Sequence, residues 1–188
     1  MATTTVVPNA DGSVTGTWSA VGGAGSRHAS VNHGISSPDD TEFVRNNMSE
    51  GDSAKYMYLG FENMPANFDT ATSVTATIRQ KGYNNDDDDV SYQLFQSNGT
   101  TALSNKITRA VDGSGVSSSF RTDTISFTRS GATSKTVWDG IQIKITHEGP
   151  GDGDDPSYSV SEIVLNIGYD AAAADTANPA FLLFLDSL

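Results

Sequence analysis

Short runs in which apolar and polar side chains alternate dominate this sequence between residues 14 and 170. A two-residue period puts successive side chains on opposite faces of an extended strand, so each run is typical of a half-buried strand. In residues 74–79, the Val, Ala and Ile side chains would share one face, and the Thr and Arg side chains the other. Turn-forming Gly, Asn, Asp, Ser and Pro residues separate the runs, and no longer window repeats with the helical period. The sequence therefore predicts an all-β chain.

The number of runs suits an antiparallel β-sandwich of about eight or nine strands. The clearer runs are residues 15–20, 55–62, 74–79, 90–96, 101–107, 122–128, 141–146 and 163–169, and two weaker ones are residues 29–31 and 42–45. The run at 55–62 carries aromatic and aliphatic side chains at both odd and even positions, which point to opposite faces of a strand. We therefore expect both of its faces to be covered.

The connections between runs favour one kind of sandwich. Asn98–Gly99 tolerates the two positive φ angles of a type I′ turn, so we expect residues 90–96 to fold back on residues 101–107. Long crossings rich in Gly, Asp and Ser, such as residues 21–35 and 149–156, suit a jelly roll better than a meander of tight hairpins. An immunoglobulin-like sandwich is the alternative, although its paired cysteines are absent.

Three segments are expected along the chain. Residues 1–13 form an N-terminal arm, residues 14–170 form the jelly-roll domain, and residues 171–188 form an Ala-rich linker and an apolar C-terminal arm. An exposed apolar tail favours aggregation, so we expect the arm to dock, either on its own sandwich or in a neighbouring subunit. The expected partner-binding residues of this arm are Phe181, Leu182, Leu183, Phe184, Leu185 and Leu188.

Charge and composition exclude several classes of partner. The chain has 11 Lys and Arg residues against 23 Asp and Glu residues, a net charge of −12, whereas nucleic-acid binding needs a clustered basic surplus. No stretch approaches the roughly 18 consecutive apolar residues of a membrane span. Residues 1–11 lack the basic and apolar regions of a signal peptide, so we expect synthesis in the cytoplasm.

No catalytic constellation stands out, and we predict that the protein is not an enzyme. The chain has no cysteine and no G-x-S-x-G nucleophile elbow, and no spacing singles out a pair of opposed carboxylates. The separation of His28 and His33 matches no metal-binding signature, so both are expected to be polar loop residues.

Two acidic runs, residues 86–89 and 152–155, raise the question of calcium. Carboxylate-rich loops can supply the oxygen ligands that Ca²⁺ prefers, and the candidate ligands are Asp86, Asp88, Asp152 and Asp154. Neither run fits the EF-hand pattern, and solvated turn residues are the alternative. No other cofactor is expected.

The aromatic residues raise a carbohydrate-binding hypothesis, because sugar rings stack on exposed aromatic side chains flanked by polar groups. Most of them fall within predicted strands, where the core is the expected location. Tyr83 and Tyr158 lie at the edges of predicted loops, so we expect these two to be exposed.

Several stretches together resemble virion-associated β-sandwich proteins of tailed bacteriophages, of the decoration or cement type. They are residues 58–68, 74–79, 86–89, 92–103, 125–128 and 138–140. The resemblance implies a jelly-roll domain on the surface of the virus particle, often as a trimer, with the major capsid protein or another virion protein as partner.

Two functional hypotheses follow. The first is a non-enzymatic structural protein, a decoration or cement subunit that binds the outer shell of a phage particle and stabilises it, because a bridging subunit needs buried interface area and no catalytic group. The alternative is a carbohydrate- or receptor-binding module of a tail or surface adhesin, with calcium in the acidic loops.

Overall fold

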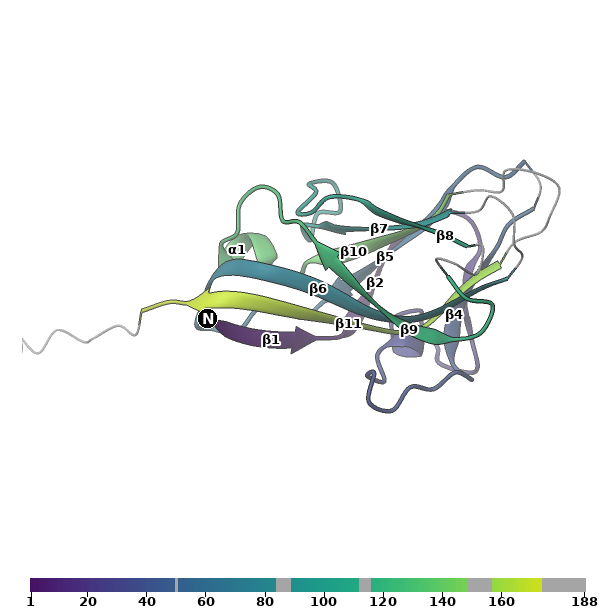
Figure 1. Cartoon of the computed structure of the whole chain (residues 1–188), viewed down its shortest axis with the longest axis horizontal. Coiled ribbons are helices and arrows are strands. Elements are labelled where there is room, and N and C mark those ends of the chain that lie inside the picture. The colour runs from purple at the N-terminus through teal and green to yellow at the C-terminus, as the bar shows by residue number, and fades with distance from the viewer. Residues whose placement is uncertain (50, 84–88, 112–115, 149–156, 174–188) are drawn as a thin grey trace, which may run out of the picture.

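The computed structural model describes residues 1–49, 51–83, 89–111, 116–148 and 157–173. Within them, the chain forms two antiparallel sheets packed face to face, which confirms the predicted all-β sandwich (Figure 1). The six-stranded sheet contains β1 (Ala2–Val6), β3 (Trp18–Val21), β4 (Phe43–Asn47), β6 (Phe68–Tyr83), β9 (Arg121–Phe127) and β11 (Ser157–Ala171). The five-stranded sheet contains β2 (Pro8–Val14), β5 (Lys55–Phe61), β7 (Asp89–Phe95), β8 (Ile107–Ala110) and β10 (Gln142–His147).

The strand order is that of a jelly roll. From β4 to β11, the chain gives the order β4-β11-β6-β9 in one sheet and β5-β10-β7-β8 in the other. Each sheet therefore pairs strands that are distant in sequence, as two Greek keys require. The predicted jelly roll is confirmed, and most of the alternating runs lie in these strands. The strand predicted at residues 101–107 is wrong over 101–106, which form a loop with isolated bridges, because the chain pairs continuously with β7 only from Ile107.

The N-terminal residues belong to the two sheets. β1 pairs with β11 from Ala2 opposite Tyr169 to Val6 opposite Leu165, and β2 pairs with β5. Figure 1 shows β1 lying along β11. Most of residues 1–13, expected to form an arm, thus lie in strands of the sandwich, because the Thr residues and Val6 of β1 have high strand propensity and fit a half-buried edge position.

Two short helices interrupt the strands. The 3-10 helix η1 (Ala29–Val31) occupies the run that was expected to form a weak strand, so that prediction is wrong. Three residues are too few for their alternation to be told from one helical turn, and here Ser30 bonds back to Ser26. The other helix, α1, spans Lys135–Trp138, and no helix in the described residues is long and apolar enough to cross a membrane.

The turn after β7 lies where Asn98–Gly99 predicted it but has a different geometry. Gln96 and Thr101 close a loop of four residues, because the Gln96 N–H donates to the Thr101 carbonyl. The Asn98 side chain accepts hydrogen bonds from the N–H groups of Thr100 and Thr101, and Gly99 takes a φ of 68°. An Asx-type loop replaces the two-residue type I′ turn.

The core between the sheets is apolar over most of its length and polar towards one end. Fully buried Ile, Leu, Val and Trp138 side chains fill the larger part. At the polar end of the core, the Gln80 Oε1 accepts hydrogen bonds from the hydroxyls of Tyr92 and Tyr158, and the His147 Nδ1 lies 3.0 Å from the Asn46 Oδ1. Burial raises the pKa of both tyrosines, so the hydroxyls stay protonated and can donate.

Candidate functional site

The outer face of the five-stranded sheet presents a row of polar and aromatic side chains. The register pairs Lys144 of β10 with Tyr58 of β5 on one side and with Gln93 of β7 on the other. Two residues along, Thr146 lies between Tyr56 and Ser91. The alternate positions, such as Ile143 and Ile145, point into the core. Strand periodicity therefore gathers residues from three distant parts of the chain on one surface.

Three aromatic rings cross this face in edge-to-face contact. The ring centroids of Tyr56 and Tyr58 are 5.6 Å apart, and those of Tyr58 and Phe95 are 5.5 Å apart. The Lys144 Nζ lies 4.3 Å from the centroid of the Tyr56 ring and 5.7 Å from that of Tyr58. Such contacts hold the rings and the ammonium group in fixed positions.

Tyr58 is covered although it belongs to the outward row. Only 7% of its surface is exposed, and a Cβ added to Gly12 of β2 would lie 2.6 Å from its Cβ. Burial is the main cause that raises the pKa of the Tyr58 hydroxyl, and the neighbouring Tyr56 raises it further, so the hydroxyl stays protonated. The prediction that both faces of residues 55–62 are covered holds here, while Tyr56 keeps a half-buried position.

Beside Tyr56 the face is hollowed, with a volume of about 310 Å³. The hollow runs across four neighbouring chain segments, and its lining combines one aromatic ring with amide, hydroxyl, ammonium and carboxylate groups. The lining residues are Ala54, Tyr56, Ser91, Gln93, Lys106, Lys144, Thr146 and Glu148.

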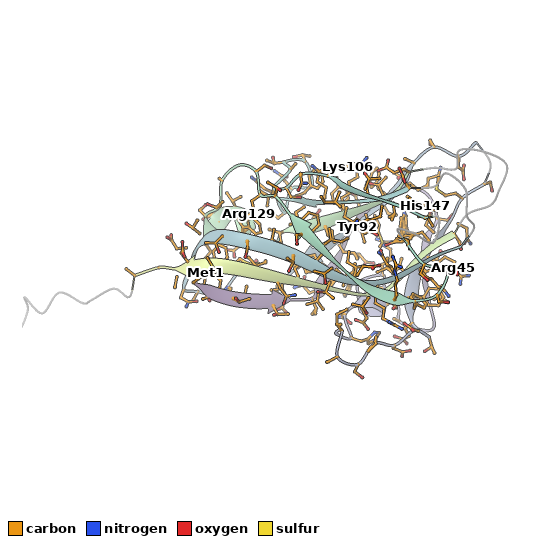
Figure 2. The ribbon with its side chains drawn as sticks, viewed as in Figure 1. Met1, Arg45, Tyr92, Lys106, Arg129 and His147 are labelled. Carbon is orange, nitrogen blue, oxygen red and sulfur yellow. The ribbon has the colours of Figure 1, made fainter. Side chains whose placement is uncertain are left out.

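Charged groups at the far side of the hollow are tied together. The Lys106 Nζ lies 2.6 Å from the Glu148 Oε1, which also accepts a hydrogen bond from the Ser91 hydroxyl. Gln93 donates its Nε2 to the Ser104 carbonyl at 2.9 Å. Figure 2 shows Lys106 on the side of the five-stranded sheet, away from the core residues Tyr92 and His147. The hollow therefore offers both hydrogen-bond donors and acceptors in fixed positions.

The structure does not describe the residues that the sequence predicted for metal and partner binding. The calcium candidates Asp86, Asp88, Asp152 and Asp154 lie outside the described residues, as do the arm residues Phe181, Leu182, Leu183, Phe184, Leu185 and Leu188. In the part of the chain that the structure describes, no group of three or more His, Asp or Glu side chains is placed to hold a metal ion. Calcium binding, the arm, the trimer and the capsid partner stay predictions.

The expectation of an exposed Tyr158 is wrong. Its side chain is fully buried between the sheets, where its ring meets Trp18 edge-on with centroids 6.2 Å apart. The physical reason is that β11 already begins at Ser157 and gives Tyr158 the same inward parity as Val160. The side chain of Tyr83 lies outside the described residues.

The histidines expected in loops lie within hydrogen-bond distance of carboxylates. The His28 Nδ1 lies 3.0 Å from the Asp11 Oδ1. His33 lies between two carboxylates, with its Nε2 3.1 Å from Glu42 and its Nδ1 3.3 Å from Glu162. Both residues fasten the segment between β3 and β4 to the sandwich.

The sequence alone did not predict that Tyr56, Gln93 and Lys144 lie next to one another. Their outward parity was readable, because Tyr56 and Tyr58 alternate with Met57 and Leu59, and Lys144 alternates with isoleucines. The strand order β5-β10-β7 brings them together, and the order of the strands was not deduced from the sequence.

No protein-family model matches the chain, and no curated protein matches it. Several solved structures are similar at low sequence identity. A family 6 carbohydrate-binding module of Cellvibrio mixtus lichenase 5A, in complex with cellotriose, is 10% identical with a TM-score of 0.45, over 89% of this chain and 98% of the module. A family 36 carbohydrate-binding module in complex with calcium and xylotriose is 12% identical with a TM-score of 0.39, over 83% of this chain and 92% of the module.

A third similar structure is the enzymatically active domain of tailspike protein 4 of bacteriophage CBA120. It is 10% identical with a TM-score of 0.47, over 88% of this chain and 19% of that one.

Proposed function

We propose that the protein is a carbohydrate-binding module whose ligand lies on the outer face of the five-stranded sheet. The observation that carries this proposal is the hollow in which the half-buried Tyr56 ring stands beside hydrogen-bonding groups from β7, β10 and the residues that flank β8 and β10. A sugar ring has one apolar face and a rim of hydroxyls, so it needs an aromatic surface next to donors and acceptors.

Each part of a sugar has a counterpart in the hollow. The Tyr56 ring is edge-on to Tyr58 and in contact with Lys144, which fixes its orientation before a ligand binds. Lys144 and Lys106 can donate to hydroxyl oxygens, whereas Glu148 and the Gln93 amide oxygen can accept from hydroxyl protons. Preorganised side chains lower the entropic cost of binding.

The dimensions support an oligosaccharide rather than a monosaccharide. The lining extends from β5 across β10 and β7 to the residue before β8. Three strand spacings of about 4.8 Å make this span roughly 14 Å.

A glycan array probed with the full chain tests the proposal, followed by calorimetry with the best oligosaccharide. Tyr56→Ala should weaken binding by about tenfold or more, because it removes the aromatic surface. Gln93→Ala should weaken binding by roughly fivefold through loss of hydrogen bonds. Thr108→Ala, at an exposed position of β8 outside the lining, is the matched control and should bind like the parent chain.

Two results would overturn the proposal. One is an array with no bound glycan, in calcium and in chelator alike. The other is a glycan whose affinity is unchanged in both Tyr56→Ala and Gln93→Ala, since that glycan would bind elsewhere. A chelator that abolishes binding would add the predicted calcium ion to the proposal, and a chelator without effect would leave the hollow sufficient by itself.

A further inference from the structure

The six-stranded sheet carries a second polar hollow on its own outer face, independent of the proposed carbohydrate site. Ser159 of β11 pairs with Arg45 of β4 on one side and with Lys81 of β6 on the other. The two cationic residues therefore flank one buried serine, with their Cα atoms about 10 Å apart by strand spacing. Figure 2 places Arg45 on the opposite side of the molecule from Lys106.

Both cations lie against aromatic rings. The Arg45 guanidinium carbon is 4.9 Å from the centroid of the Phe43 ring. The Lys81 Nζ is 5.3 Å from the same centroid and 4.4 Å from that of Phe120. The two rings touch each other edge-on at 5.6 Å. The rings attract both cations and hold them near each other, but an aromatic ring carries no net charge and does not neutralise them.

The neighbouring Arg79 differs, because its charge is met by a carboxylate. Its Nε and Nη2 donate to the two oxygens of Asp40 at 2.7 and 2.5 Å. Lys81 acts on Asp40 from farther away, contributing to the lowered pKa of that carboxyl. Among the described residues, neither Arg45 nor Lys81 forms an ion pair with an acidic side chain, although the chain carries a net charge of −12.

Arg45 also has a donor without an acceptor. Its Nε is buried and meets no hydrogen-bond partner within the described residues. A buried donor that has left water without gaining a partner costs free energy, so it needs an explanation. The Nε has almost no surface open to the hollow, so an anion bound there would reach this donor only after the guanidinium turns.

The hollow beside these residues has the size and lining for a small oxyanion. Its volume is about 240 Å³, and the described residues that line it are Arg45, Lys81, Ser118 and Ser157. Guanidinium, ammonium and hydroxyl groups are the side chains that bind phosphate and sulfate oxygens. The acidic remainder of the chain repels an extended polyanion such as nucleic acid, whereas a single charged group can enter.

We propose that this hollow binds a single sulfate or phosphate monoester group. The Arg45 guanidinium and the Lys81 ammonium neutralise the oxyanion, and the hydroxyls of Ser118 and Ser157 donate to its remaining oxygens. The site lies on the face opposite the hollow at Tyr56, so binding at either site can be disproved without affecting the proposal for the other.

The test follows the Arg45 Nε–H resonance of the ¹⁵N-labelled full chain, assigned by its loss in Arg45→Gln. Sodium sulfate is titrated against sodium chloride at equal ionic strength, and then galactose 6-sulfate, galactose 6-phosphate and galactose are added in separate titrations. We expect the resonance to shift with sulfate and with one of the two esters, and to stay in place with chloride and with galactose. The ester that binds identifies the anion.

Variants separate the site from general charge effects. Lys81→Gln should weaken ester binding by about tenfold, because it removes one of two charge-assisted contacts. Arg109→Gln, which removes one positive charge at an exposed position of β8, is the matched control and should leave the affinity unchanged. The proposal is overturned if both esters shift the resonance no more than chloride does, or if Lys81→Gln and Arg109→Gln have equal effects.

Discussion

The two outer faces of the sandwich use charged residues differently. On the six-stranded sheet, the segment between β3 and β4 lies over the strands, as Figure 1 shows, and the charges beneath it are paired. On the five-stranded sheet, Lys106, Lys144 and Glu148 line an open hollow. The part of the six-stranded sheet beneath this segment is thus covered, whereas the hollow at Tyr56 is accessible.

Glu162 shows what covering a face requires. It is fully buried on β11, and its carboxylate accepts hydrogen bonds from the N–H groups of Gly34 and Asp39 at 2.8 and 3.4 Å, with His33 at 3.3 Å. Burial raises the pKa of this carboxyl, although these partners oppose the shift. A carboxylate beneath the covering segment therefore depends on its hydrogen-bond partners, whereas side chains in the open hollow at Tyr56 can exchange their partners for a ligand.

The largest expected difference between the faces comes from the same substitution made on each. Glu162→Ala should lower the free energy of unfolding by about 3 kcal/mol, because it leaves two buried N–H groups and His33 without their acceptor. Glu148→Ala should cost only about 1 kcal/mol, since its partner Lys106 is half exposed and can be hydrated. Urea denaturation at pH 7 measures both, and equal costs would contradict the comparison.

A pH series sharpens the comparison through Asp40. The hydrogen-bonded ion pair with Arg79 is the main cause that lowers the pKa of Asp40 below its ordinary value of 3.8. Burial acts in the opposite direction, and a hydrogen bond from Ser161 lowers the pKa further. A lowered pKa stabilises the fold above pH 3.8, and this contribution is lost as the pH falls through the folded-state pKa. Asp40→Asn should cost about 1 kcal/mol at pH 7 and progressively less below pH 3.8.

Urea denaturation of the parent chain and of Asp40→Asn between pH 7 and pH 3 measures this difference. A cost that stays constant down to the lowest pH would show that the variant acts through packing and not through the charge.

The smallest expected change is on the open face. Lys144→Gln should lower the free energy of unfolding by about 0.5 kcal/mol, because it removes the contact between the ammonium group and the Tyr56 ring. Its effect should be larger on glycan binding than on stability. A loss of 2 kcal/mol or more, well above the usual range for an exposed cation–ring contact, would assign Lys144 to the structural framework.

The fold was predictable to the extent that one face of each strand is apolar. Ile163, Leu165 and Ile167 mark β11 without ambiguity, and the long crossings correctly favoured a jelly roll. The polar core was not predicted, although Gln80 continues the inward parity of Ile78 and His147 that of Ile145. A polar residue at an inward position looks like the end of a strand until its partners on other strands are known.

The candidate site was less predictable than the fold. Exposed tyrosines were sought at loop edges, but the half-buried Tyr56 lies within β5 and Tyr158 lies in the core. Residues 54–56, 91–93 and 144–148 come together only through the strand order of the sheet, which depends on nonlocal pairing. Short-range patterns carry no information about that pairing.

The pairing of β1 with β11 determines how the sandwich would respond to mechanical force. Ala2 lies opposite Tyr169, so the start of β1 and the end of β11 leave the sheet at the same end of the molecule (Figure 1). A pull applied between Met1 and Ala173 would load the hydrogen bonds of this antiparallel pair one after another, as in a zipper. β1 would peel away at low force, while the strands from β4 to β9 would carry no load until β11 itself began to detach.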